Sequence, residues 1–136
     1  MKAIKYWLPP IIWAGLIFYL SSLTPGSVSG PAWLDFIIKK GAHITEYGIL
    51  FVLLYRALFK TVSTTKRKLL ILTLIGTILY AGSDEYHQSF VPGRHAALMD
   101  VGFDSFGGII SMFAVWKYLP KAPKKLKNLA KSLELL

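Results

Sequence analysis

The chain has 136 residues, of which 54% are hydrophobic and 17% are charged, and its mean hydropathy is +0.48. This balance is too apolar for an ordinary soluble domain and indicates an integral membrane protein. The formal net charge is +9, but the basic residues lie at the ends of apolar segments, which favours membrane orientation over nucleic-acid binding. The lack of cysteine excludes a disulfide, a zinc–thiolate site and a thiol nucleophile.

Four apolar stretches follow one another along the chain, and each is long enough to cross about 30 Å of hydrocarbon as a helix. They are residues 6–23, 33–58, 69–86 and 97–118. We therefore expect an all-α fold, a polytopic membrane protein with four transmembrane helices in a bundle. The expected organisation is a four-helix transmembrane domain over residues 1–120 and a basic cytoplasmic tail over residues 121–136.

The first stretch has the basic start and apolar middle of a secretory signal. No A-x-A cleavage site follows it, however, and Trp7, Trp13 and Tyr19 are bulky for such a segment. The sequence therefore favours a retained first span.

The distribution of charge predicts the orientation of these spans. Of the 16 lysine and arginine residues, 13 lie at the N-terminus, around the connection between the second and third stretches, or from the end of the fourth stretch onward. The positive-inside rule then places both termini in the cytoplasm. Six of the seven acidic residues fall in the opposite, outer half.

The tail has the pattern of a short amphipathic helix. Leu126, Leu129, Ala130 and Leu133 follow helical spacing, and lysines occupy the other face. Such a helix is expected to lie on the anionic inner leaflet. The alternative is a disordered basic tail, and neither version carries chemistry.

The most informative feature is a polar cluster between the third and fourth stretches. Residues 80–108 contain Asp84, Glu85, His87, Arg94, His95, Asp100 and Asp104. Charged groups are costly near hydrocarbon, so a cluster of them there is a functional-site hypothesis. On the second stretch, Lys39, His43, Glu46 and Tyr47 share one helical stripe. We expect helices two to four to bury these faces together as a polar cleft that opens to the outer leaflet.

The connection before the fourth stretch contains Pro92-Gly93, the dipeptide typical of the centre of a type II turn. Such a turn would fold Arg94 back toward the acidic residues. Its planar guanidinium suits either a carboxylate or phosphate ligand or a salt bridge to Asp84, Glu85 or Asp100. His95, just after the turn, is expected to be solvated.

Three chemistries remain open for this cluster. In the first, His43 and His87 with carboxylates hold a divalent metal such as zinc or manganese, although no compact H-E-x-x-H-like spacing occurs. In the second, Asp84 or Glu85 acts as base or nucleophile toward a lipid-linked phosphate, with His87 as proton donor. In the third, the residues form an ion-pair network that fixes helix register and binds a head group without turnover.

The same residues resemble a known family. The motif residues are Lys40, His43, Glu46 and Tyr47; Ser83, Asp84, Glu85, His87, Gln88, Phe90, Pro92, Gly93 and Arg94; and Asp100, Asp104, Gly107 and Gly108. In this order they resemble the VanZ-like family of small bacterial membrane proteins, over roughly residues 8–118. Asp104 stands where many members of that family have Asn.

The resemblance implies a protein of the bacterial inner membrane with a role at the cell envelope. The family takes its name from an accessory protein of glycopeptide-resistance clusters that lowers susceptibility to the lipoglycopeptide teicoplanin. It supplies no reaction that can be transferred residue by residue, so whether this chain is an enzyme stays open.

We expect the cleft to bind an anionic ligand through Arg94 and Lys40. The candidate ligands are a lipid-linked wall precursor, a phospholipid head group and a lipoglycopeptide antibiotic. The candidate ligand-binding residues are Lys40, His43, Glu46, Tyr47, Gln88, Arg94, Asp100 and Asp104.

Overall fold

The computed structural model describes residues 2–24, 26, 30–94 and 97–135, and these ranges contain helices and no strand. The elements are α1 (Lys2–Ser22), α2 (Ala32–Thr61), α3 (Lys66–Gln88), α4 (Leu98–Phe113), a π-helical turn (Ala114–Tyr118), a 3-10 turn (Leu119–Lys121) and α5 (Lys124–Ser132). The predicted all-α fold is confirmed.

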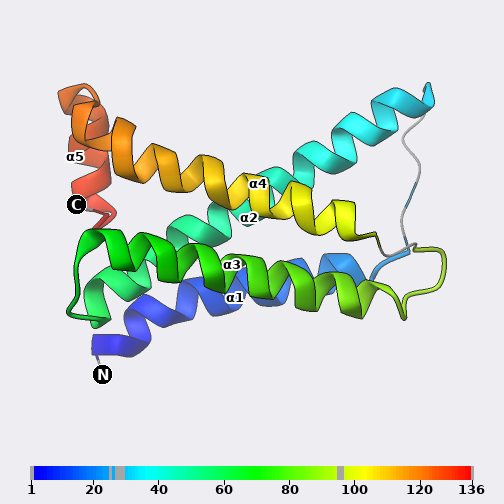
Figure 1. Cartoon of the computed structure of the whole chain (residues 1–136), viewed down its shortest axis with the longest axis horizontal. Helices are drawn as coiled ribbons and strands as arrows, with labels where there is room; N and C mark the ends of the chain where they lie inside the picture. Colours follow the sequence, from blue (N-terminus) through cyan, green and yellow to red (C-terminus); the bar gives the residue numbers. More distant parts are fainter. Residues whose placement is uncertain (1, 25, 27–29, 95–96, 136) are drawn as a thin grey trace.

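Four helical segments are long and apolar enough to cross a membrane, as the sequence predicted. They are Ala3–Ser22, Ala32–Thr61, Lys66–Gln88 and Leu98–Lys121, the last of which continues α4 through the two irregular turns. The chain is therefore a multi-pass membrane protein. An even number of spans returns the chain to the side on which it starts, and both termini lie at the same end of the bundle (Figure 1).

Glycines on α4 allow close helix packing. A Cβ on Gly107 would collide with the backbone carbonyl of Ile44 on α2, and one on Gly108 would lie 3.2 Å from the Thr77 side chain of α3. Because glycine lacks that atom, α4 fits against both neighbours at once. α2 crosses the bundle obliquely, so it meets α4 over its N-terminal half and α1 and α3 farther along (Figure 1).

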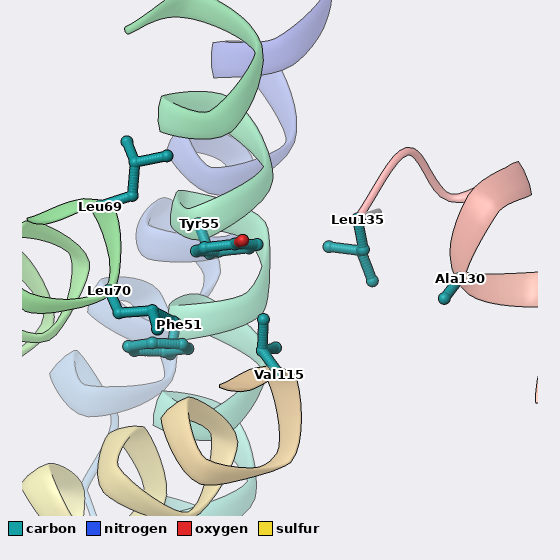
Figure 2. Close-up of a cluster of buried hydrophobic side chains, with 7 residues drawn as sticks. All are labelled: Phe51, Tyr55, Leu69, Leu70, Val115, Ala130 and Leu135. Carbon is teal, nitrogen blue, oxygen red and sulfur yellow. The ribbon is translucent and has the colours of Figure 1, made fainter. Parts of the chain in front are cut away.

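A cluster of buried hydrophobic side chains lies at the end of the bundle where the termini are. It joins Phe51 and Tyr55 of α2, Leu69 and Leu70 of α3, and Val115 after α4 to Ala130 and Leu135 of the tail. Figure 2 shows Leu135 directed from the C-terminal segment toward the bundle. The tail is thus helical and packed through these two side chains, whereas Leu126, Leu129 and Leu133 are exposed.

Glu134 binds the tail to the bundle through ion pairs and hydrogen bonds. Its carboxylate accepts a hydrogen bond from Arg56 Nη2 at 2.6 Å and one from the Tyr6 hydroxyl at 3.4 Å, and Lys5 Nζ lies 3.6 Å away. These partners come from α1 and α2, so the tail is tied to the first half of the chain. This hydrogen bond and the basic neighbours lower the pKa of Glu134 below its ordinary value of 4.5.

Candidate functional site

A polar pocket of about 230 Å³ lies near the end of the bundle opposite the termini. We call this cavity the polar pocket. It is lined by Ile17, Leu20 and Ser21 of α1, by Lys39, Ala42, His43 and Glu46 of α2, by Asp84 of α3, and by Gly26 and Arg94 from the connections. The lining places the C-terminal ends of α1 and α3 beside residues 39–46 of α2. The charged residues of the lining therefore come from the interior of α2, from the end of α3 and from the connection after α3.

The lining differs from the expectation that helices two to four would form the cleft. No described residue of α4 lines the pocket, and α1 takes its place. Sequence reasoning did not predict a role for α1 here, because α1 carries no acidic residue and has no basic residue in its last turn. Ser21, the penultimate residue of α1, is 5% exposed, and its hydroxyl contacts Asp84 as well as the Phe18 carbonyl.

Asp84 is held by three neutral donors. The Ser21 hydroxyl donates to Oδ1 at 2.5 Å, and the Tyr47 hydroxyl and the Gln88 amide donate to Oδ2 at 3.0 and 2.9 Å. Asp84 is 3% exposed, so these donors replace water around its carboxylate. Tyr47 and Gln88 thus lie behind Asp84 and do not line the pocket.

Arg94 reaches the pocket through the predicted turn. The Arg94 amide donates to the Val91 carbonyl at 3.1 Å, and Gly93 has a φ of 81°, as the third position of a type II turn requires. The turn prediction is confirmed. It folds Arg94 back over the end of α1, where the guanidinium meets the pocket.

The guanidinium of Arg94 contacts only uncharged acceptors among the described residues. It donates to Gln88 Oε1 at 2.9 Å, to the Leu20 carbonyl at 3.1 Å and to the Leu23 carbonyl at 3.2 Å. The last carbonyls of a helix lack intrahelical partners, which makes the end of α1 a natural acceptor for a cation. The alternative of a salt bridge to Asp84, Glu85 or Asp100 is not what the structure contains, because Gln88 stands between Arg94 and Asp84.

The two other charged groups of the α2 lining differ in their partners. Lys39 Nζ lies 2.7 Å from Asp35 one turn earlier, so its charge is matched. The Glu46 side chain is half-buried and makes no hydrogen bond or ion pair to the described part of the chain. Its backbone carbonyl accepts a hydrogen bond from Trp13 Nε1 at 2.9 Å, which fixes α1 to α2 at this level.

Beside the pocket, two charge pairs join α2 to α4. Lys40 Nζ lies 2.5 Å from Asp100 Oδ1, and His43 Nδ1 lies 2.9 Å from Asp104 Oδ1. Asp104 has no exposed surface, so the His43 ring separates it from the pocket. Because a carboxylate oxygen accepts, Nδ1 carries the hydrogen of this bond and Nε2 is the remaining site of the imidazole.

Glu85 and His87, both candidates for catalysis, lie away from the pocket lining. Glu85 Oε1 accepts a hydrogen bond from the Ala97 amide at 2.5 Å, at the start of α4, and its Oε2 is buried without a described partner. Asp84 and Glu85 are therefore both buried although adjacent, since they face different neighbours. His87 stacks on Phe18 with ring centroids 4.1 Å apart, and its Nδ1 lies 3.4 Å from Ser21 Oγ.

The suggested metal site has no assembled ligand set in the ranges that the structure describes. No group of three or more histidine and carboxylate side chains lies together there. His43 contacts Asp104, and His87 contacts Phe18 and Ser21. His95 is outside the described residues.

The structure therefore divides the predicted site residues into two groups. His43, Glu46, Asp84 and Arg94 line the polar pocket. Lys40, Tyr47, Glu85, His87, Gln88, Asp100 and Asp104 surround it or connect helices nearby. Sequence reasoning left Ser21 out of the site. It placed Lys39 on the polar stripe of His43 and Glu46 but did not count it among the ligand-binding residues.

Comparison with known proteins agrees with the motif residues. No curated protein and no solved structure matches the chain. A family model described as VanZ/LLP1 matches residues 6–119, which include all four spans almost entirely and every residue that lines the polar pocket. The chain therefore belongs to the VanZ/LLP1 family.

Proposed function

We propose that the polar pocket binds the anionic head group of an amphiphile at the cell envelope. The observation that carries the proposal is the Arg94 guanidinium, which borders the cavity and is bound only to neutral acceptors in the described chain. A planar guanidinium with unused N–H groups favours a phosphate or carboxylate. The candidate ligands are a lipid-linked wall precursor, a phospholipid head group and a lipoglycopeptide such as teicoplanin.

The direction in which the pocket opens follows from the charge distribution. With both termini in the cytoplasm, the opposite end of the bundle faces the outer leaflet of the bacterial inner membrane, where wall precursors and antibiotics are accessible. A topology reporter fused at Pro31 should then report the outside, and one fused at Thr64 should report the cytoplasm. The reverse result would place the pocket on the cytoplasmic side.

Binding can be tested on the full-length protein in detergent micelles with dihexanoyl phosphatidylglycerol as the anionic probe. We expect Arg94→Gln to weaken binding at least about tenfold, because a charge-assisted hydrogen bond is replaced by a neutral one. Arg94→Lys should retain part of the affinity, since it keeps the charge but loses the planar fork. The intrinsic tryptophan fluorescence provides the signal.

Arg67→Gln is the matched control, because Arg67 is an exposed arginine at the start of α3, at the other end of the bundle. It should bind the probe as the unmodified protein does. If Arg94→Gln folds normally and binds the probe with unchanged affinity, the pocket is not an anion site.

A second candidate function is favoured by the His43–Asp104 pair. An imidazole oriented by a buried carboxylate, with its other nitrogen as the remaining proton-transfer site, is suited to general acid–base chemistry. The pocket would then belong to a membrane-embedded hydrolase or transferase acting on a lipid-linked phosphate. This version predicts that the purified protein releases inorganic phosphate from a short-chain polyprenyl diphosphate and that His43→Gln abolishes the release. A pure binding protein releases none.

A further inference from the structure

The charged groups of the polar pocket balance one another in number but not in pairing. The lining contains two basic residues, Lys39 and Arg94, and two acidic residues, Glu46 and Asp84. Lys39 is matched by Asp35, and Asp84 is surrounded by three hydrogen-bond donors. Asp84, Arg94 and Glu46 all lack an ion-pair partner in the described chain. Asp84 is 3% exposed and both of its oxygens already accept hydrogen bonds, which leaves Arg94 and Glu46 as the charged groups available to a ligand.

These two groups do not satisfy each other. Arg94 is fixed on the end of α1 and on Gln88, whereas Glu46 stands on α2, and no ion pair joins them. Both border the same cavity of about 230 Å³, which exceeds the volume of several water molecules at about 30 Å³ each. The cavity thus offers one cationic and one anionic anchor, with room for a small head group between them.

A ligand with only negative charge fits this arrangement poorly. Its anionic group would bind Arg94, but the half-buried Glu46 carboxylate would face it across a partly enclosed cavity, where like charges repel more strongly than in bulk water. A ligand that also carries a cation would neutralise Glu46. A primary ammonium suits a carboxylate best, because its N–H groups donate charge-assisted hydrogen bonds that a quaternary ammonium cannot donate.

From this geometry we propose that the ligand of the polar pocket is zwitterionic, with a phosphate bound by Arg94 and a primary ammonium bound by Glu46. Phosphoethanolamine has this chemistry, either as a phospholipid head group or as a free solute. The proposal rests on the proposed anion-binding function and adds a second subsite to it. Glu46 becomes the residue that selects the ligand, and Arg94 the residue that anchors it.

The test compares short-chain lipids on the full-length protein in detergent micelles. The probes are dihexanoyl phosphatidylethanolamine, phosphatidylcholine and phosphatidylglycerol, with free phosphoethanolamine as a fourth. We expect phosphatidylethanolamine to bind at least about tenfold more tightly than the choline and glycerol lipids, the effect of one charge-assisted hydrogen bond. Free phosphoethanolamine that competes with equal affinity would assign the site to a solute, and weaker competition would assign it to a lipid.

Glu46→Gln should remove this preference while leaving binding of phosphatidylglycerol unchanged or stronger. Glu46→Asp keeps the charge and should keep part of the preference. Glu134→Gln is the matched control, because it makes the same substitution at the opposite end of the molecule, where Glu134 binds Arg56. It should leave all the affinities unchanged.

The outcomes separate the two proposals. Equal affinity for the ethanolamine and glycerol lipids in the unmodified protein overturns the ammonium subsite, and this comparison needs no variant that folds. A preference that survives in Glu46→Gln overturns it as well. If binding of both lipids still depends on Arg94, the anion site stands without the second subsite, whereas binding of both lipids that is independent of Arg94 rejects the proposed function itself.

Discussion

Adjacent residues on α2 show how differently charge is used on the two sides of this helix. Lys40 faces α4 and pairs with Asp100 at 2.5 Å, while Lys39 lines the polar pocket together with His43, Glu46 and Arg94. On the α4 side, acidic and basic groups are matched across two helices. On the pocket side, Arg94 and Glu46 have no ion-pair partner among the described residues. Charge in this bundle therefore stabilises packing where it is paired between helices, and it is available for a ligand where it is not.

The physical basis of this division is the cost of charge near hydrocarbon. An ionisable group in a membrane-spanning segment needs a partner, a hydrogen-bond network or a water-filled cavity. Asp104, with no exposed surface, has His43 as its described partner. Glu46 and Arg94 instead border a cavity. His43 belongs to both sides, since one ring nitrogen binds Asp104 while the ring lines the pocket.

The largest effect on stability is expected from removing the carboxylate of Asp104, which pairs with His43 between α2 and α4. We expect Asp104→Ala to lower the free energy of unfolding by about 3 kcal/mol, because it leaves His43 without its acceptor and opens a void at a fully buried position. Asp104→Asn keeps an acceptor oxygen of the same size and should recover most of the loss. The thermal unfolding midpoint in detergent measures both variants.

If Asp104→Ala unfolds at the same temperature as the unmodified protein, the His43–Asp104 pair contributes nothing to packing. Its role would then lie wholly on the pocket side. An effect on lipid affinity without an effect on stability would support that conclusion.

A smaller effect is expected from crowding the α2–α4 contact without altering charge. A methyl group at Gly107 would collide with the Ile44 backbone carbonyl, so Gly107→Ala should cost about 1–3 kcal/mol as the helices move apart. Gly102→Ala is the control, because nothing lies within 4 Å of a Cβ there and alanine favours helix over glycine by about 1 kcal/mol. Equal stability of the two variants would show that the close contact is not needed.

The sequence predicted the spans and the turn because their signals are local. Apolar length and helical spacing define each span, and Pro92-Gly93 defines the turn that folds Arg94 back. The pairing of Asp100 and Asp104 with Lys40 and His43 could also be anticipated, because these residues occupy polar stripes of two helices that must face each other in lipid.

What the sequence could not reveal was which helices enclose the pocket. Arg94 binds the carbonyls of Leu20 and Leu23, and every helix end has such carbonyls whatever its sequence. Nothing in the apolar pattern of α1 distinguishes its end as the acceptor. Lys39 lines the pocket and Lys40 contacts α4 because of the rotational orientation of α2 about its own axis. Residue spacing alone does not determine that orientation.

On the pocket side, substitution should change stability little. Glu46→Gln removes a carboxylate that has no described partner, so we expect the free energy of unfolding to change by no more than about 0.5 kcal/mol, as for substitutions away from networks. Thermal unfolding without added lipid measures it. Destabilisation as large as that of Asp104→Ala would show that Glu46 belongs to the structural network, and the contrast between the two sides of α2 would be lost.

The smallest effect is expected at the end of the bundle where the termini lie, because the Arg56–Glu134 ion pair there is partly exposed to water. Because Arg56 lowers the pKa of Glu134, the tail contact is strongest above the ordinary value of 4.5, where the carboxylate is ionised in both the docked and the undocked tail. It weakens as the pH falls through the lower pKa of the docked state. Amide hydrogen exchange in α5 should therefore accelerate below about pH 4.5 once corrected for the intrinsic rate, and Glu134→Gln should remove this dependence. If the exchange of α5 is independent of pH, the apolar contacts of Ala130 and Leu135 hold the tail alone.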